Sequence, residues 1–164
     1  MCGIIMVKQL NGLNANRQIK KIYFSQKERG VNGYGFYNVS KGVYARSKYE
    51  HEILGLLHKN PGNEILFHHR KPTSTSNTEN TAHPLCSKDN FEKHNYYMVH
   101  NGMIYNSKEL YRKHTDAKLK YDSVCGVGKF DEPIFNDSES LMLELALVIE
   151  GKKDAKEFGA YGSM

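Results

Sequence analysis

The chain opens with Met1-Cys-Gly-Ile-Ile-Met-Val7, which places a cysteine directly before a short apolar run. Because this run is rich in β-branched and other apolar residues, it predicts a buried strand that begins at the N-terminus itself. The fold is therefore expected to start with this strand, and Cys2 stands at its beginning.

Cys2 can supply both parts of an activated nucleophile. Methionine aminopeptidases remove an initiator Met before small residues such as cysteine, and this would leave Cys2 with a free α-amino group. The ordinary pKa of that amine is about 7.7–8.0, so it can accept the thiol proton near neutral pH. A small buried residue at a strand edge would explain the same sequence. Met-Cys-Gly alone therefore fits either a nucleophile or a structural cysteine.

Three helices are expected from apolar spacing and from capping residues. Ile19, Ile22 and Tyr23 predict one face of the first helix. Ser47 and Glu50 have capping-box spacing and predict the start of a second helix. Residues 138–150 form the clearest helical pattern, with Asp137 or Ser138 as the cap and Gly151 at the end.

Strand patterns alternate with these helices. Residues 34–39 and 43–46 predict a hairpin, and further strands are expected at 65–68 and 96–99. The Ser/Thr/Asn-rich segment 71–81 is a loop, either an active-site lid or a surface excursion. This order of hairpin strands and helices favours an α+β fold over a regular βαβ repeat.

Length and composition limit the classes of protein that fit. The chain has 164 residues, of which 39% are apolar and 25% charged, and this indicates one globular domain over residues 1–164. No apolar run is long enough for a membrane span or a signal peptide, so a cytoplasmic location is expected. Cys2, Cys86 and Cys125 are expected to be free thiols.

The charge is uneven along the chain. Residues 1–60 contain ten Lys/Arg and three acidic residues, while residues 121–164 contain four Lys/Arg and nine acidic residues. A basic segment can attract nucleic acid by counterion release. Its cations are interspersed with apolar residues at helical spacing, and no nucleic-acid-binding motif accompanies them, so a solvated face is the better interpretation. Neither nucleic acid nor a membrane is expected as a partner.

The histidines and cysteines do not form a recognisable metal motif. Their spacing matches neither a zinc finger nor an HExxH pattern. We therefore expect no metal and no other cofactor. The residues considered for zinc are His68, His69, His83, Cys86, His94 and His100.

Several short motifs occur together with Met1-Cys-Gly-Ile4 and residues 30–36. They are Phe67-His-His-Arg-Lys-Pro-Thr73, Asn80-Thr-Ala-His-Pro84, Met98-Val-His-Asn-Gly102 and Asn136-Asp-Ser-Glu139. In order and interval this set resembles the class II glutamine amidotransferase family, whose members are N-terminal nucleophile glutaminases. The resemblance runs from Cys2 to about Tyr161. It implies a four-layer αββα sandwich and hydrolysis of the glutamine side-chain amide.

The resemblance assigns the reacting groups. Cys2 matches the nucleophile, and Asn101 with the backbone N–H of Gly102 matches the oxyanion hole. Two preorganised donors at about 2.7–3.1 Å suit a tetrahedral oxyanion, and glycine lets the backbone approach closely. A type I′ turn is the other common use of an Asn-Gly pair.

The resemblance also assigns the groups that bind the free amino acid. Arg70 matches the ligand of the glutamine carboxylate and Asp137 the ligand of its ammonium, although an ion-pair role and an N-cap role would also explain them. Thr73 keeps a hydroxyl expected near the carboxylate, and His83 is expected to orient the site. In the family Trp-Ala-Thr follows the arginine, but here Lys-Pro-Thr follows it, which puts the lid in doubt.

The reaction expected from this resemblance passes through a thioester of Cys2 and supplies ammonia to a synthetase on another chain or in a missing downstream domain. Two alternatives remain open, a catalytically silent module that regulates a synthetase and an N-terminal nucleophile hydrolase of another amide. Residues 158–164 look like the start of a strand. In the family further strands follow, so the second sheet is expected to be C-terminally truncated or completed by a partner.

Overall fold

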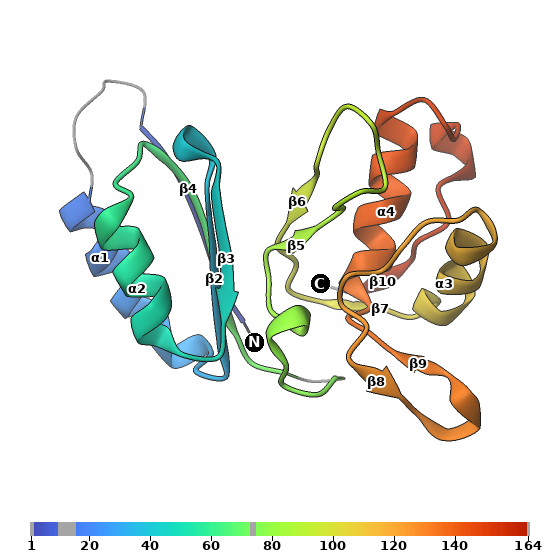
Figure 1. Ribbon diagram of the computed structural model, residues 1–164, viewed down its shortest axis with the longest axis horizontal. Helices are drawn as coiled ribbons and strands as arrows, with labels where there is room; N and C mark the ends of the chain where they lie inside the picture. The colour runs from blue at the N-terminus through green and yellow to red at the C-terminus, as the bar shows by residue number, and fades with distance from the viewer. Residues whose placement is uncertain (1, 10–15, 73–74, 164) are drawn as a thin grey trace. The chain divides into compact units, whose positions relative to one another are not determined.

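The computed structural model describes residues 2–9, 16–72 and 75–163. Its elements divide between two compact units, residues 1–84 and residues 85–164 (Figure 1). The mixture of helices and antiparallel strands is of the α+β kind, while the four-layer sandwich and the single domain over 1–164 stay predictions. Within the described ranges, every helix is too short or too polar to span a lipid bilayer.

The first unit contains a four-stranded antiparallel sheet with the strand order β1-β4-β2-β3. β1 and β4 pair from Gly3 opposite His69 to Lys8 opposite Glu64. The predicted N-terminal strand, the hairpin over 34–46 and the strand at 65–68 are confirmed. The strands are β1 (Gly3–Lys8), β2 (Gly33–Asn38), β3 (Val43–Ser47) and β4 (Glu64–Arg70).

Two helices, α1 (Asn16–Ser25) and α2 (Glu50–Lys59), lie side by side on one face of this sheet (Figure 1). Alternate strand residues point into the core between sheet and helices, and each fully buried aliphatic or aromatic side chain there contributes about 1.5–3 kcal/mol. This burial holds β1 and β4 in register. The buried core residues are Ile5, Ile19, Tyr23, Tyr34, Phe36, Ile53, Leu57, Ile65 and Phe67.

Two details of the predicted helices are wrong. Ile22 is 42% exposed, because α1 buries only Ile19 and Tyr23, which are one turn apart. The capping box between Ser47 and Glu50 does not form, because α2 begins at Glu50 itself. Glu50 instead makes an ion pair of 2.6 Å with Lys27.

Two glycines let backbone segments approach the sheet closely. A Cβ atom on Gly35 would lie 2.0 Å from the carbonyl oxygen of His83, so only glycine allows this segment to cross β2. A Cβ atom on Gly30 would lie 2.5 Å from the carbonyl carbon of Arg70. Gly35 therefore fixes where the chain crosses β2, and Gly30 fixes where it passes the end of β4.

The second unit is built around α4 (Ser138–Ile149), which confirms the helix predicted at 138–150. The strand predicted at 96–99 is reduced to β6 (Tyr97–Met98), which pairs with β5 (Leu85–Cys86). The buried core of this unit combines one face of α4 with β5 and the loop after it. Its members are Leu85, Phe91, Met142, Leu143 and Ala146.

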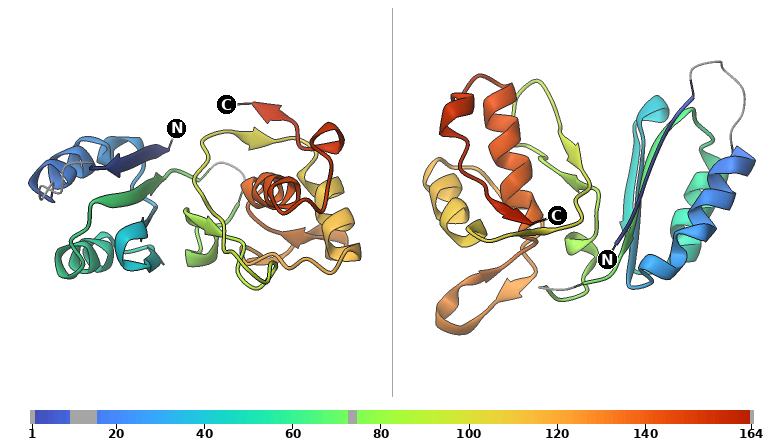
Figure 2. Two further views of the ribbon diagram at one scale, coloured as in Figure 1. Left: turned by 90° about the horizontal axis from the view of Figure 1, so that it is seen from above. Right: turned by 180° about the vertical axis from the view of Figure 1, so that it is seen from behind.

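The other elements of this unit are short. β10 (Gly162–Ser163) pairs antiparallel with β7 (Met103–Ile104), which confirms the strand expected within 158–164 (Figure 2). α3 (Ser107–Asp116) and the hairpin of β8 (Gly126–Val127) and β9 (Pro133–Ile134) were not expected from the sequence. Single 3-10 turns complete the two units, at Lys27–Arg29, Val39–Lys41, Glu79–Thr81, Lys129–Asp131 and Ala155–Glu157.

Candidate active site

The predicted site residues fall into two groups, one in each unit. Cys2, Arg70 and His83 belong to the first unit, while Gly102 and Asp137, with Asn101, belong to the second. Thr73 lies outside the residues that the structure describes. Each group is described below within its own unit.

Cys2 lies directly before β1, next to the end of β4. Its neighbour Gly3 pairs with His69, which brings the sulfur to the backbone of Lys71. The Lys71 N–H donates to the Cys2 Sγ at 3.3 Å, and the thiol is 3.5 Å from the Lys71 carbonyl oxygen. Cys2 is partly exposed, so the thiol is both oriented by the backbone and open to solvent.

Arg70 is the last residue of β4, and its side chain is buried. The guanidinium donates from Nη1 to the Ser76 carbonyl oxygen at 3.3 Å and to the Asn77 Oδ1 at 3.1 Å, and from Nη2 to the Thr75 hydroxyl. These neutral acceptors orient the planar fork, which is the geometry that suits a carboxylate. Arg70 therefore also organises the loop that follows it.

His83 is buried and lies against His68 of β4. The His83 Nδ1 is 3.2 Å from the His68 Nε2, and one proton between them makes the hydrogen bond. Burial lowers the pKa of His68 well below its ordinary value, and the neighbouring His83, His69 and Arg70 lower it further. His68 is therefore neutral, and its contact with His83 connects the 82–84 segment to the strand that ends in Arg70.

In the second unit, Gly102 packs closely against the side chain of His100, two residues earlier in the chain. A Cβ atom on Gly102 would be 2.7 Å from the His100 Nε2. Neither Asn101 nor Gly102 has a positive φ, so the type I′ turn that an Asn-Gly pair often forms is excluded here. The two residues lie in the loop that leads into β7.

Asp137 is brought to the same loop. Its Oδ2 accepts a hydrogen bond of 2.6 Å from the Ile104 backbone N–H, two residues after Gly102. Asp137 occupies the predicted N-cap position of α4, but its side chain makes no capping hydrogen bond. The Asn136 Oδ1 accepts from the Ser138 N–H at 3.1 Å instead.

Two further residues of this region, Ser138 and Glu139, were not predicted as site residues. The Ser138 hydroxyl lies 2.9 Å from the His100 Nδ1, and burial lowers the pKa of His100, although the Asp137 carboxylate opposes this. Glu139 is buried and accepts hydrogen bonds from the Asp122 N–H at 2.7 Å and the Ser123 N–H at 2.9 Å. The motif Asn136-Asp-Ser-Glu139 predicted that this region belongs to the site. It did not predict which partner each of its residues contacts.

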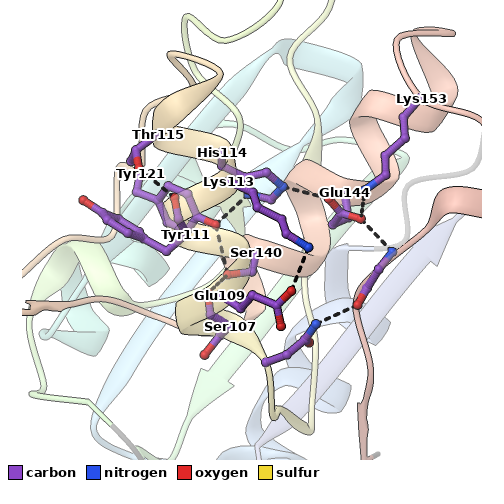
Figure 3. A network of polar contacts seen from close by, with 12 residues as sticks. Ser107, Glu109, Tyr111, Lys113, His114, Thr115, Tyr121, Ser140, Glu144 and Lys153 are labelled. Atoms are coloured by element: carbon purple, nitrogen blue, oxygen red, sulfur yellow. Dashed lines mark hydrogen bonds and ion pairs between the residues drawn. The ribbon is translucent and has the colours of Figure 1, made fainter.

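A second polar network lies within the second unit (Figure 3). His114 is buried, with its Nε2 2.9 Å from the Glu144 Oε1 and its Nδ1 2.7 Å from the Tyr121 hydroxyl. Glu144 also accepts from the Lys153 Nζ at 2.6 Å and the Gly159 N–H at 2.8 Å. This network connects α3, α4 and the segment after α4.

Among the described residues, no group of three or more His, Cys, Asp or Glu side chains is arranged to hold a metal ion. The chemistry available from the described side chains is that of a thiol, an arginine, amide and backbone donors and a carboxylate.

Comparison with known proteins gives one distant similarity. No family model matches the chain. The chain is 27% identical over 128 residues to a 7-cyano-7-deazaguanine synthase of Sulfolobus acidocaldarius, and the match covers 71% of this chain and 26% of that protein. The chain therefore spans about a quarter of the length of the curated relative that it matches.

Proposed function

We propose that this chain is a glutaminase that hydrolyses the side-chain amide of glutamine. After removal of Met1, the α-amine of Cys2 takes the thiol proton, and the sulfur attacks the amide carbon. The C–N bond then breaks, and ammonia leaves with a proton returned by the same amine. Water hydrolyses the γ-glutamyl thioester to glutamate and regenerates the thiol.

The observation that carries this proposal is the placement of Cys2 and Arg70 at one end of the first sheet. Gly3 pairs with His69, so the residues that flank this pair, Cys2 and Arg70, belong to adjacent ends of β1 and β4. The sulfur contacts Lys71, the residue that follows Arg70. A nucleophile and a buried arginine at adjacent strand ends suit a substrate with an amide at one end and a carboxylate at the other.

The other groups proposed for the reaction, on the basis of the resemblance, are residues of the second unit. Asn101 and the Gly102 N–H are the proposed oxyanion donors, and Asp137 is the proposed ligand of the α-ammonium. Asp137 hydrogen bonds Ile104, so its carboxylate is held next to the loop that contains Asn101 and Gly102. A preformed loop of this kind lowers the reorganisation needed when negative charge develops on the amide oxygen.

The acceptor of the ammonia is proposed to be a synthase. The relative from Sulfolobus acidocaldarius is a synthase by name, and three quarters of its length lies outside the match. We therefore place the acceptor site on a separate chain or in a segment that corresponds to the unmatched part of that relative.

Ammonia and glutamate release from glutamine tests the proposal. The chain whose N-terminus is shown by intact mass to be Cys2 should release both, and Cys2→Ala should release neither while keeping its circular dichroism spectrum. Cys125→Ala is the matched control, since Cys125 contacts Ile134 in the second unit and should keep full activity. Equal activity in Cys2→Ala, or none in the processed chain mixed with its synthase partner, would refute it.

A further inference from the structure

We propose that Asp137 is also the anchor of the loop over residues 100–104, so that one carboxylate both binds the substrate ammonium and positions the oxyanion donors. This inference rests on the proposed glutaminase function. It gives Asp137 a positioning role in addition to its role in binding, and it ties the reaction to amides of amino acids with a free α-ammonium.

The first step of the argument is the hydrogen bond from Ile104. Its backbone N–H donates to the Asp137 Oδ2 at 2.6 Å, a short distance that is typical of a charge-assisted bond. Ile104 belongs to β7, which begins directly after Gly102. Holding Ile104 therefore limits the positions available to the Gly102 N–H, two peptide groups earlier.

The second step is that the Asp137 carboxylate makes no hydrogen bond to the described residues besides the one with Ile104. Asn136 caps α4 through its own side chain, so the Asp137 carboxylate is not needed at the helix start. No hydrogen bond to the Asp137 Oδ1 occurs within the described residues. The two oxygens can thus serve two donors, the Ile104 N–H on Oδ2 and an ammonium on Oδ1.

The third step is that the adjacent residue holds the other end of the same loop. The Ser138 hydroxyl lies 2.9 Å from the His100 Nδ1, and His100 in turn packs against Gly102. Asp137 and Ser138 therefore fix both ends of the 100–104 loop from the start of α4. An ammonium bound at Asp137 would meet a carboxylate whose position is already set by that loop.

Two substitutions separate the charge of Asp137 from its hydrogen bond. Asp137→Asn keeps an amide oxygen that can accept from Ile104 but loses the charge that binds ammonium, so it should raise KM with little change in kcat. Asp137→Ala loses both, so it should raise KM similarly and also lower kcat by at least about tenfold, as loss of oxyanion donors does. Asp154→Asn is the control, because that aspartate caps a 3-10 turn elsewhere in the second unit.

A readout that needs no catalysis is the backbone amide of Ile104, observed by NMR. Its hydrogen exchange should stay slow in Asp137→Asn and become faster in Asp137→Ala. In the unchanged chain, glutamate should shift the Ile104 amide resonance, while N-acetylglutamate at the same concentration should not. The last measurement applies even if Asp137→Ala does not fold.

The outcomes distinguish this inference from the proposed function. Equal kcat and equal Ile104 exchange in the two variants would overturn the anchor, even in an active glutaminase. The anchor would also be overturned if glutamate shifted other amide resonances but left the Ile104 resonance unchanged. A chain without glutaminase activity would refute the proposed function, and Ile104 exchange would then still decide whether Asp137 holds the loop.

Discussion

A Cβ atom on Gly102 would lie 2.0 Å from the carbonyl oxygen of Ser163. Ser163 belongs to β10, which pairs with β7, so the C-terminal strand passes directly over the proposed oxyanion residue. The Ser163 carbonyl oxygen is a backbone atom, so it cannot move aside as the end of a flexible side chain can. The contact therefore requires glycine at position 102 for steric reasons that are independent of φ.

Gly102→Ala is expected to displace β10 and to lower the free energy of unfolding by about 1–3 kcal/mol, the usual cost of overpacking. Thermal denaturation followed by circular dichroism measures the change. Gly55→Ala is the matched control, because its Cβ would meet no atom within 4 Å and alanine favours the interior of α2. A Gly102→Ala protein as stable as the unchanged chain would show that β10 does not pack there.

Arg70→Ala is expected to reduce stability as well as glutamine binding. The guanidinium is buried and donates to three groups of the 75–77 loop, so its removal takes one hydrogen bond from each of these groups. Limited proteolysis should cut the loop faster, and KM for glutamine should rise at least about tenfold if the side chain binds the substrate carboxylate. Arg17→Ala, at an exposed position of α1, should change neither quantity.

Acidification is expected to destabilise the first unit through His68. The pKa of His68 in the folded chain is below the ordinary value of 6.5, because the site is buried and faces His83, His69 and Arg70. Below pH 6.5 the unfolded chain therefore binds a proton that the folded chain does not, and the free energy of unfolding falls as the pH falls. Urea denaturation at pH 7.5 and pH 5.5 measures this slope.

His68→Gln should make that pH dependence smaller, since it removes the buried group that titrates. His51→Gln changes an exposed histidine of α2 and should leave the slope as it is. If both variants kept the full slope, the pH dependence would come from other histidines.

Glu144→Gln is expected to destabilise the second unit. The carboxylate is buried between Lys153 and His114, and burial favours the neutral acid, but hydrogen bonds from Lys153, Gly159 and His114 lower the pKa of Glu144 overall. A neutral amide cannot balance Lys153, so we expect a loss of about 1–3 kcal/mol. Glu157→Gln, an exposed carboxylate nearby in sequence, should cost much less, and an equal loss in both would contradict the role of the network.

The sequence predicted those elements in which apolar spacing and turn residues agree. β1, the β2–β3 hairpin and α4 were found because buried side chains dominate them. α3 was missed because its buried face is partly polar, with Leu110 and His114 buried on an otherwise charged helix. The β8–β9 hairpin was missed because each of its strands is only two residues long.

The site was predicted from side-chain types, and the interactions that position it are largely with the backbone. The Ile104 N–H on Asp137 and the Lys71 N–H on Cys2 leave no trace in a pattern of residue types. Asp137 occupies the predicted N-cap position, but the side chain that accepts from the first N–H of α4 is that of Asn136. Asn and Asp are both good capping residues, so the residue types alone do not show which of the two accepts this hydrogen bond.

Four consecutive residues at the start of α4, Asp137 to Ser140, each contact a different residue. Asp137 reaches Ile104, Ser138 reaches His100, Glu139 reaches Ser123, and Ser140 donates to the carbonyl oxygen of Ser107. Successive residues of a helix are turned by roughly 100°, so their contacts radiate in different directions. An insertion of one residue in this turn would rotate every later contact to the wrong side. The start of α4 thus fixes the register between the helix and the segments around it. Substitutions there should be tolerated far better than an insertion or a deletion.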